Sequence, residues 1–165
     1  PILASIKPAI VPVLRAGLGM AEGLSQLIPT APTGHIGLFR DPKTKRPVEY
    51  YVRLPENKAR LFILVDPMLA TGYSASYAVD VLNKYGVPDS KVRFMAMAAA
   101  PEGMRAFYEA HPTVEVWAAA LDDKLNEKAY IVPGLGDAVD RLFETNYSVL
   151  SLSLNMSSKV RCKTE

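Results

Sequence analysis

The chain has 165 residues, 49% of them hydrophobic and 22% charged, and a formal net charge of +2 at pH 7. These values are typical of one soluble globular domain, and they exclude a disordered chain. The small net charge argues against nucleic acid as a partner, and so does the sequence, because no cluster of Lys and Arg is interleaved with aromatics. Cys162 is the only cysteine, which excludes an internal disulfide and favours a reducing, cytoplasmic setting.

The first part of the chain predicts a strand, a helix and two further strands. The short apolar run at residues 9–14 indicates a strand, and the leucines of residues 17–28 recur at helical intervals. Two β-rich runs, at residues 35–39 and 48–54, flank the turn-forming stretch "RDPKTKRP". We expect these two runs to form an antiparallel pair.

The apolar run at residues 61–65 shows no alternation, which indicates a strand buried on both faces of a parallel sheet. Residues 74–86 place Ala75, Ala78, Val79 and Leu82 on one helical face and end at a glycine, a common helix stop. Three further segments continue the pattern: a strand at 91–99, a helix at 102–111 and a strand at 114–121. This order predicts an α/β fold with a central, mostly parallel sheet flanked by helices and an antiparallel excursion around residues 35–54.

The stretch "DPMLATGYS" at residues 66–74 follows the buried strand and opens the next helix. Ligands of open α/β sheets bind at such places, and N–H groups and hydroxyls at a helix start can bind a phosphate. Asp66 could face hydroxyl groups or a metal-bound ligand. The alternative is that Asp66 only ends a strand and Thr71 to Ser74 only cap a helix. The stretch is not a Walker loop, because it lacks the Gly-Lys-Ser/Thr ending.

The block "VDPMLATG" resembles the phosphoribosyl-diphosphate (PRPP) signature of type I phosphoribosyltransferases, in the variant found in uracil phosphoribosyltransferases. Four other blocks agree with that family in order and rough spacing: "VPVLRAGLGM", "GHIGLFRD", "AAPEG" and "YIVPGLGDAVDRLF". The resemblance covers about residues 11–143 and implies a type I phosphoribosyltransferase-like fold. It also implies transfer of the 5-phosphoribosyl group from PRPP to uracil, giving UMP and diphosphate in pyrimidine salvage.

The resemblance assigns roles by position. Catalytic roles fall to Arg15 and Arg40, suited to clamping diphosphate, and to Asp137, which would orient or deprotonate the uracil nitrogen. The residues assigned to PRPP are Arg15, Arg40, Asp66, Pro67, Met68, Leu69, Ala70, Thr71, Gly72, Tyr73, Ser74 and Asp137. The residues assigned to uracil are Ile131, Gly136, Asp137 and Ala138.

The resemblance further implies Mg²⁺ delivered with PRPP rather than held in a dedicated metal site, and GTP as an allosteric activator of some members. It implies a cytoplasmic homo-oligomer, a dimer or tetramer, with no membrane partner. His35 and His111 are expected to be structural or surface residues. Trp117, Met95 and Met97 are expected in the core.

Three departures from the family pattern keep a second function open. The phosphoribosyltransferase domain, residues 1–145, is expected to lack an N-terminal segment that members carry, and residues 146–165 are expected to form an atypical, loosely ordered tail. Tyr73 stands where uracil enzymes usually have glycine, and we expect it to leave the loop usable. The alternative function is a non-catalytic PRPP- or nucleotide-binding module, or an inactive truncated product.

Overall fold

The computed structural model describes residues 7–41, 46–56 and 60–144. The expectation for residues 146–165 lies outside this part of the chain. The strands are β1 (Ala9–Leu14), β2 (His35–Arg40), β3 (Pro47–Arg53), β4 (Phe62–Val65), β5 (Met68–Leu69), β6 (Val92–Ala99), β7 (Glu115–Leu121), β8 (Lys124–Leu125) and β9 (Ile131–Val132). The helices are α1 (Leu18–Leu27), α2 (Tyr73–Lys84), α3 (Pro101–Ala110) and α4 (Ala138–Phe143), with a 3-10 turn, η1 (Asp89–Lys91).

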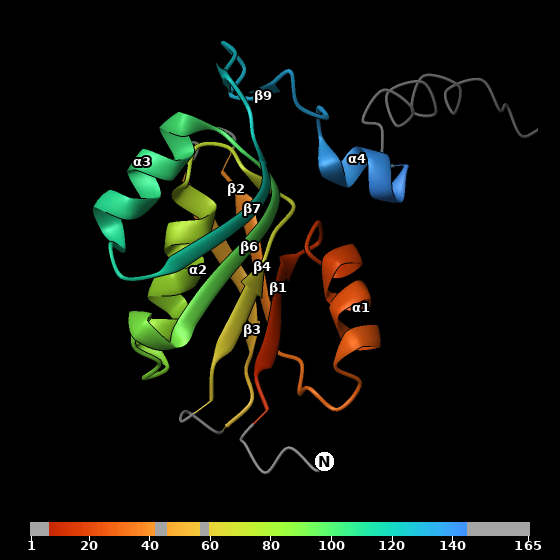
Figure 1. The fold of residues 1–165 in the computed structure, drawn as a ribbon, viewed down its shortest axis with the longest axis vertical. Helices are drawn as coiled ribbons and strands as arrows, with labels where there is room; N and C mark the ends of the chain where they lie inside the picture. The colour runs from red at the N-terminus through yellow and green to blue at the C-terminus, as the bar shows by residue number, and fades with distance from the viewer. Residues whose placement is uncertain (1–6, 42–45, 57–59, 145–165) are drawn as a thin grey trace, which may run out of the picture.

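A mostly parallel sheet forms the centre of the fold, with α1 on one face and α2 and α3 on the other (Figure 1). β1 pairs in parallel with β2 and with β4, β4 with β6, and β6 with β7. β3 runs antiparallel to β2, with His35 opposite Arg53. The predicted fold class and the antiparallel excursion are therefore confirmed.

The order of the strands reverses between β1 and β4. From β1 the chain crosses by α1 to β2 and β3 on one side, and then returns to place β4 on the other side of β1. Open α/β sheets bind ligands beyond the carboxyl ends of the strands at such a reversal. The fold therefore predicts a ligand crevice beyond Leu14 and Val65, the last residues of β1 and β4.

β4 is covered on both faces, as its unbroken apolar sequence predicts. Phe62 and Leu64 belong to the large core cluster under α2 and α3, whereas Ile63 and Val65 pack into the smaller cluster under α1. Only Ile63 keeps partial exposure. The helix after β4 is confirmed too: Ala75, Ala78, Val79 and Leu82 are all buried under α2, and Gly86 leaves the helix with φ +88°.

The expectation that Trp117 and Met97 are core residues is wrong. Trp117 is 62% exposed and Met97 48% exposed. Trp117 lies on β7, which pairs only with β6 within the described part of the chain, and only its neighbour Val116 packs against the large core cluster. Met95 is half-buried against the α1-side cluster. Apolar sequence alone predicts a strand, but it does not say which strand ends at the edge of the sheet.

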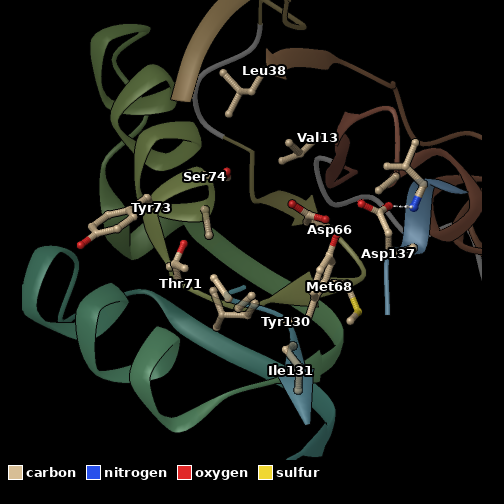
Figure 2. Close-up of a pocket in the computed structure, with 18 of the residues that line it drawn as sticks. Val13, Leu38, Asp66, Met68, Thr71, Tyr73, Ser74, Tyr130, Ile131 and Asp137 are labelled. Carbon is tan, nitrogen blue, oxygen red and sulfur yellow. Dashed lines mark hydrogen bonds between the residues drawn. The ribbon is translucent and has the colours of Figure 1, made fainter. Parts of the chain in front are cut away.

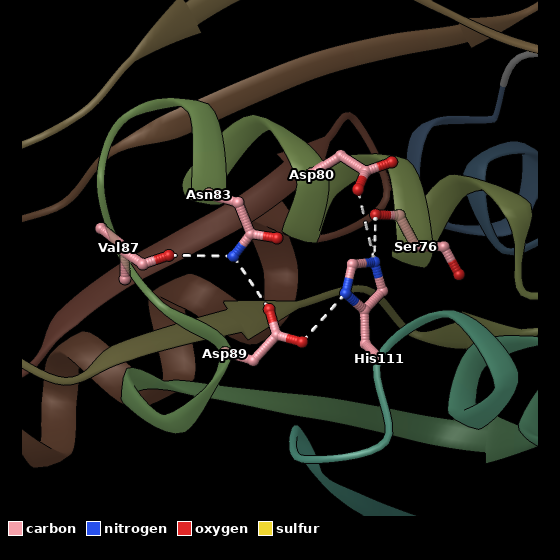
Figure 3. A network of polar contacts seen from close by, with 6 residues as sticks. All are labelled: Ser76, Asp80, Asn83, Val87, Asp89 and His111. Carbon is pink, nitrogen blue, oxygen red and sulfur yellow. Dashed lines mark hydrogen bonds and ion pairs between the residues drawn. The ribbon is translucent and has the colours of Figure 1, made fainter.

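His111 is a buried structural residue at the end of α3, as one of its two predicted roles requires, and His35 is half-buried in β2. Figure 3 shows that the His111 ring lies among acceptor oxygens: Nδ1 is 3.1 Å from Asp89 Oδ2, and Nε2 is 3.1 Å from the backbone oxygen of Ser76. Asp80 Oδ1 is 3.6 Å from Nε2. These contacts fix the end of α3 against α2 and the turn η1.

The helices of the described segments include none with the length and apolar character that crossing a membrane requires.

Candidate active site

A cleft of about 760 Å³ opens at the carboxyl ends of β1, β2 and β4. Its walls come from the β1–α1 loop, the end of β2, the segment from Asp66 to the first turn of α2, the β8–β9 hairpin and the start of α4 (Figure 2). The volume lies within the usual range for small-molecule sites, about 300 to 1,000 Å³. The cleft therefore lies at the predicted strand reversal and is large enough for a sugar phosphate and a base.

Asp66 follows β4 directly, and its backbone N–H donates to Met95 O at 3.1 Å, which continues the β4–β6 pairing. The residue is half-buried and lines the cleft. Figure 2 shows its carboxylate directed into the space between the labelled residues. The strand end thus holds one carboxylate to which the hydroxyl groups of a ligand can donate hydrogen bonds.

Pro67 is the one assigned residue of this segment that does not line the cleft. Its side chain is buried, and its carbonyl accepts the N–H groups of Met97 and Ala98, both at 3.0 Å. The following two residues form the short strand β5 against β6. Pro67 therefore supports the loop from behind, while Met68 through Ser74 line the cleft.

The left-handed position of the loop falls on Gly72, with φ +82°, and Tyr73 is the first residue of α2. Added to Gly72, a Cβ would approach Gly103 O to 2.7 Å. Tyr73 is 61% exposed, and its ring points away from the other labelled side chains in Figure 2. The tyrosine therefore needs no strained backbone.

The start of α2 is an anion-binding arrangement. The first hydrogen bond of the helix runs from Ser76 N–H to Gly72 O at 2.9 Å, so the earlier N–H groups have no acceptor within the helix. Among the described residues no side chain caps them. The hydroxyl-bearing Thr71 and Ser74 line the cleft at the same place. A helix of this length adds its dipole to the attraction for a phosphate.

The two predicted arginines lie at the carboxyl ends of neighbouring parallel strands. Arg15 lies in the β1–α1 loop, exposed and lining the cleft, after a cis Leu14–Arg15 peptide bond. Its guanidinium lies over the ring of Phe143, with Cζ 5.6 Å from the ring centroid. Arg40 is the last residue of β2 and pairs with Pro47, while its side chain lies outside what the structure describes. The fold thus brings both backbone positions to the carboxyl edge of the sheet.

The residues predicted to bind the base lie on the opposite wall. Ile131 is in β9, 2% exposed, and packs with Ala98 and Ala100. The loop after β9 is fixed by Asp122, whose Oδ2 accepts the Gly134 N–H at 3.0 Å. Gly136 has φ +74° and an open surrounding where a Cβ would stand. Gly136 therefore lines the cleft on a loop that Asp122 holds in place.

Asp137 caps α4. Its Oδ1 accepts the N–H groups of Val139, at 2.8 Å, and Asp140, at 3.2 Å. The residue is exposed and lines the cleft together with Ala138 (Figure 2). Sequence reasoning gave Asp137 a role toward the ligand and did not foresee this cap. The cap explains how the loop passes from Gly136 into a short helix at the cleft wall.

The cleft has further wall residues that sequence reasoning did not single out. They are Val13, Leu14, Ala16, Leu38, Phe39, Glu127, Lys128, Ala129, Tyr130, Val139 and Ala75. Tyr130 had the clearest signal, because it directly precedes Ile131 in the glycine-rich block. Within the described ranges, no three His, Cys, Asp or Glu side chains gather to hold a metal ion.

Comparison with known proteins shows, over most of the chain, the same family that the sequence blocks resemble. The family model described as uracil phosphoribosyltransferase matches residues 2–145. The uracil phosphoribosyltransferase of Rhodospirillum centenum is 66% identical over 145 residues, covering 88% of this chain and 67% of that protein. The one from Ralstonia pickettii is 60% identical over the same lengths. The chain thus spans about two thirds of the length of these curated relatives.

Solved structures agree with the fold. The AQ2163 protein from Aquifex aeolicus superimposes with a TM-score of 0.78 at 39% identity, covering 85% of this chain and 66% of that one. The orotate phosphoribosyltransferase from Aeropyrum pernix is 18% identical with a TM-score of 0.52, covering 84% of this chain and 66% of that one. The second likeness supports the type I phosphoribosyltransferase fold alone.

Proposed function

The chain belongs to the uracil phosphoribosyltransferase family, and on that premise we propose that it transfers the 5-phosphoribosyl group of PRPP to uracil, giving UMP and diphosphate in pyrimidine salvage. The observation that carries the proposal is the start of α2, where unbonded N–H groups, Thr71 and Ser74 open into the cleft beyond Asp66. Its chemistry fits a 5′-phosphate beside ribose hydroxyls.

In this proposal the segment from Met68 to Ser74 binds the 5′-phosphate, and Asp66 binds the ribose hydroxyls. Arg15 and Arg40 bind the diphosphate, because a planar guanidinium donates paired hydrogen bonds to phosphate oxygens. The reaction breaks a sugar–oxygen bond through a cationic sugar and an anionic leaving group. Fixed positive charge at the diphosphate lowers the barrier more than a nucleophilic side chain would.

Mg²⁺ bound together with PRPP would supply positive charge beside the diphosphate. The carboxylates of Asp66 and Asp137, which both line the cleft, are oxygen ligands of the kind that Mg²⁺ takes, directly or through water. The protein supplies the remaining contacts: Arg15 and Arg40 hold the leaving group, and the α2 N-terminus holds the sugar phosphate.

Uracil binds on the opposite wall, where Ile131, Gly136 and Ala138 present backbone donors and acceptors to its polar edge. Asp137 orients the uracil nitrogen or takes up its proton. Its Oδ1 accepts two N–H bonds in the α4 cap, so such a role falls to the other carboxylate oxygen. Asp137→Asn keeps a cap acceptor, so turnover lost with PRPP binding unchanged would support the acid–base role.

Labelled uracil incubated with PRPP and Mg²⁺ tests the proposal, with orotate, cytosine and adenine as competing bases. We expect labelled UMP and no product from the other bases. PRPP binding measured by titration calorimetry with no UMP formed would instead support the non-catalytic binding module.

Activation by GTP, a homo-oligomeric state and a cytoplasmic location remain proposals drawn from the family resemblance. A change in rate of about fivefold on adding GTP would support the first, because a coupling free energy of about 1 kcal/mol has that effect. Sedimentation at several protein concentrations tests the second, and cell fractionation the third.

A further inference from the structure

The first turn of α3 lies outside the cleft and contacts both of its walls. α3 begins at Pro101, directly after Ala100, whose N–H donates to Leu69 O at 3.0 Å. The helix therefore starts behind the PRPP loop, the segment from Met68 to Ser74 that is proposed to bind the 5′-phosphate. Neither Glu102 nor Gly103, the next two residues, lines the cleft.

Glu102 binds the β8–β9 hairpin, which belongs to the base wall, the side of the cleft that is proposed to bind uracil. Its Oε1 accepts the backbone N–H of Leu125 at 3.1 Å. Leu125 pairs across the β8–β9 hairpin with Ile131, the residue assigned to uracil. β8 and β9 have two residues each, so their ladder is short and gives little stability on its own. The bond from Glu102 therefore supplies the hairpin with an external anchor directly opposite Ile131.

Gly103 contacts the phosphate wall, the side of the cleft that the PRPP loop forms. A Cβ on Gly103 would lie 2.2 Å from Ala70 O and 2.8 Å from Leu69 O, so only glycine allows this approach of the helix to the loop. The contact continues on the other side, where Gly103 O lies 2.7 Å from the position of a Cβ on Gly72. The backbone of α3 thus lies directly against the loop that starts α2.

One apolar cluster joins these two contacts. Ala98, Ala100 and Ile131 form its buried part, and Met68, Ala70 and Leu125 pack against it. Its members come from the end of β6, from Ala100, which caps the start of α3, and from the PRPP loop and the hairpin. Movement of the first turn of α3 would therefore displace residues of both walls of the cleft.

We propose that the first turn of α3 positions both halves of the site, with Glu102 setting the base wall through Leu125 and Gly103 setting the phosphate wall through Ala70. Glu102 is thus a positioning residue that does not touch substrate. The inference rests on the proposed function for the names of the two ligands. It assigns the affinity for uracil to Glu102 and the affinity for PRPP to Gly103.

The test compares Glu102→Ala with Glu102→Gln, which keeps an oxygen acceptor, and with Glu109→Ala, an exposed glutamate on the same helix. We expect Glu102→Ala to raise KM for uracil about three- to tenfold, the size of one lost hydrogen bond, with KM for PRPP within about twofold. Glu102→Gln restores most of the difference, and Glu109→Ala changes neither constant. Gly103→Ala raises KM for PRPP more than KM for uracil.

Amide hydrogen exchange of the ligand-free protein gives a readout independent of activity. We expect faster exchange over residues 124–132 in Glu102→Ala and wild-type exchange in Glu102→Gln. Unchanged exchange, or equal increases of both KM values, would overturn the inference. Absence of UMP formation by the wild-type protein would overturn the proposed function instead, and the exchange measurement would still decide the positioning role.

Discussion

The guanidinium of Arg15 lies over the ring of Phe143, with 5.6 Å between Arg15 Cζ and the ring centroid. The contact joins the β1–α1 loop to the last residue of α4, and Leu142 of the same helix lies within 4.0 Å of where a Cβ on Gly19 would stand. The helix that starts at the base wall therefore ends on the arginine proposed to bind diphosphate.

Removing this ring is expected to weaken PRPP binding. A cation–π contact at an exposed site contributes about 0.5 to 1 kcal/mol, so Phe143→Ala should raise KM for PRPP about two- to fivefold. Phe143→Tyr, which keeps the ring face, serves as the control and should bind as the wild type does. Initial rates at varied PRPP measure the effect, and an unchanged KM in Phe143→Ala would show that the ring does not position Arg15.

Tyr73 is expected to leave the PRPP loop usable. Because Gly72 takes the left-handed conformation and the Tyr73 ring is exposed, Tyr73→Gly should change PRPP affinity by less than about twofold. Gly72→Ala is the contrasting variant: a side chain at φ +82° costs about 1 to 2 kcal/mol and meets Gly103 O. Calorimetric titration with PRPP separates the two, and a large gain in affinity for Tyr73→Gly would show that the tyrosine crowds the phosphate.

The anchor at Glu102 is expected to respond to acid. The hydrogen bond from the Leu125 N–H lowers the pKa of Glu102 below its ordinary value, and its own backbone N–H, Arg105 and Lys124 act in the same direction against desolvation. A lowered pKa means that the contact is complete at neutral pH and is lost as the pH falls through that lowered pKa.

The amide resonance of Leu125 reports this titration directly. We expect its chemical shift to move with a midpoint below that of an ordinary exposed glutamate, and to show no such step in Glu102→Gln. A midpoint at or above the ordinary glutamate value would contradict the hydrogen bond in solution.

His111 is expected to stabilise the fold without touching the cleft. Replacing His111 by alanine removes a buried ring whose Nδ1 lies 3.1 Å from Asp89 Oδ2 and whose Nε2 lies 3.1 Å from the backbone oxygen of Ser76. These two oxygens then lose the ring as a hydrogen-bond partner. The free energy of unfolding should fall by about 1 to 3 kcal/mol. Thr113→Ala, at an exposed position of the following turn, is the control. Denaturant unfolding measures both, and equal stability of the two variants would contradict a structural role for His111.

Some elements could be predicted because their sequences carry strong local signals. β4 and α2 show an unbroken apolar run and a helical spacing of small apolar residues, and both are found where those patterns place them. β5 and the β8–β9 hairpin were not predicted, because strands of two residues have no period to detect and form only where tertiary contacts pair them. The exposure of Trp117 depends on its place at the edge of the sheet, which local sequence does not encode.

The candidate site divides in the same way. The segment from Met68 to Ser74 is continuous in sequence, so one motif identifies it, and the structure places it on the cleft wall. Leu38 reaches the same cleft from a distant segment, because the strand order places β2 beside β1. Tyr130 reaches it from the β8–β9 hairpin, which forms a separate two-stranded sheet. The cap made by Asp137 and the stacking of Phe143 on Arg15 depend on side-chain geometry, which no spacing rule supplies.

The most direct test of the central claim is the product balance of a single reaction with labelled uracil, PRPP and Mg²⁺. The account predicts that UMP and diphosphate form in equal amounts, that neither forms without PRPP, and that Arg15→Ala lowers the rate about a hundredfold or more by removing charge from the leaving group. PRPP that binds without yielding UMP, or diphosphate released without UMP, would contradict it.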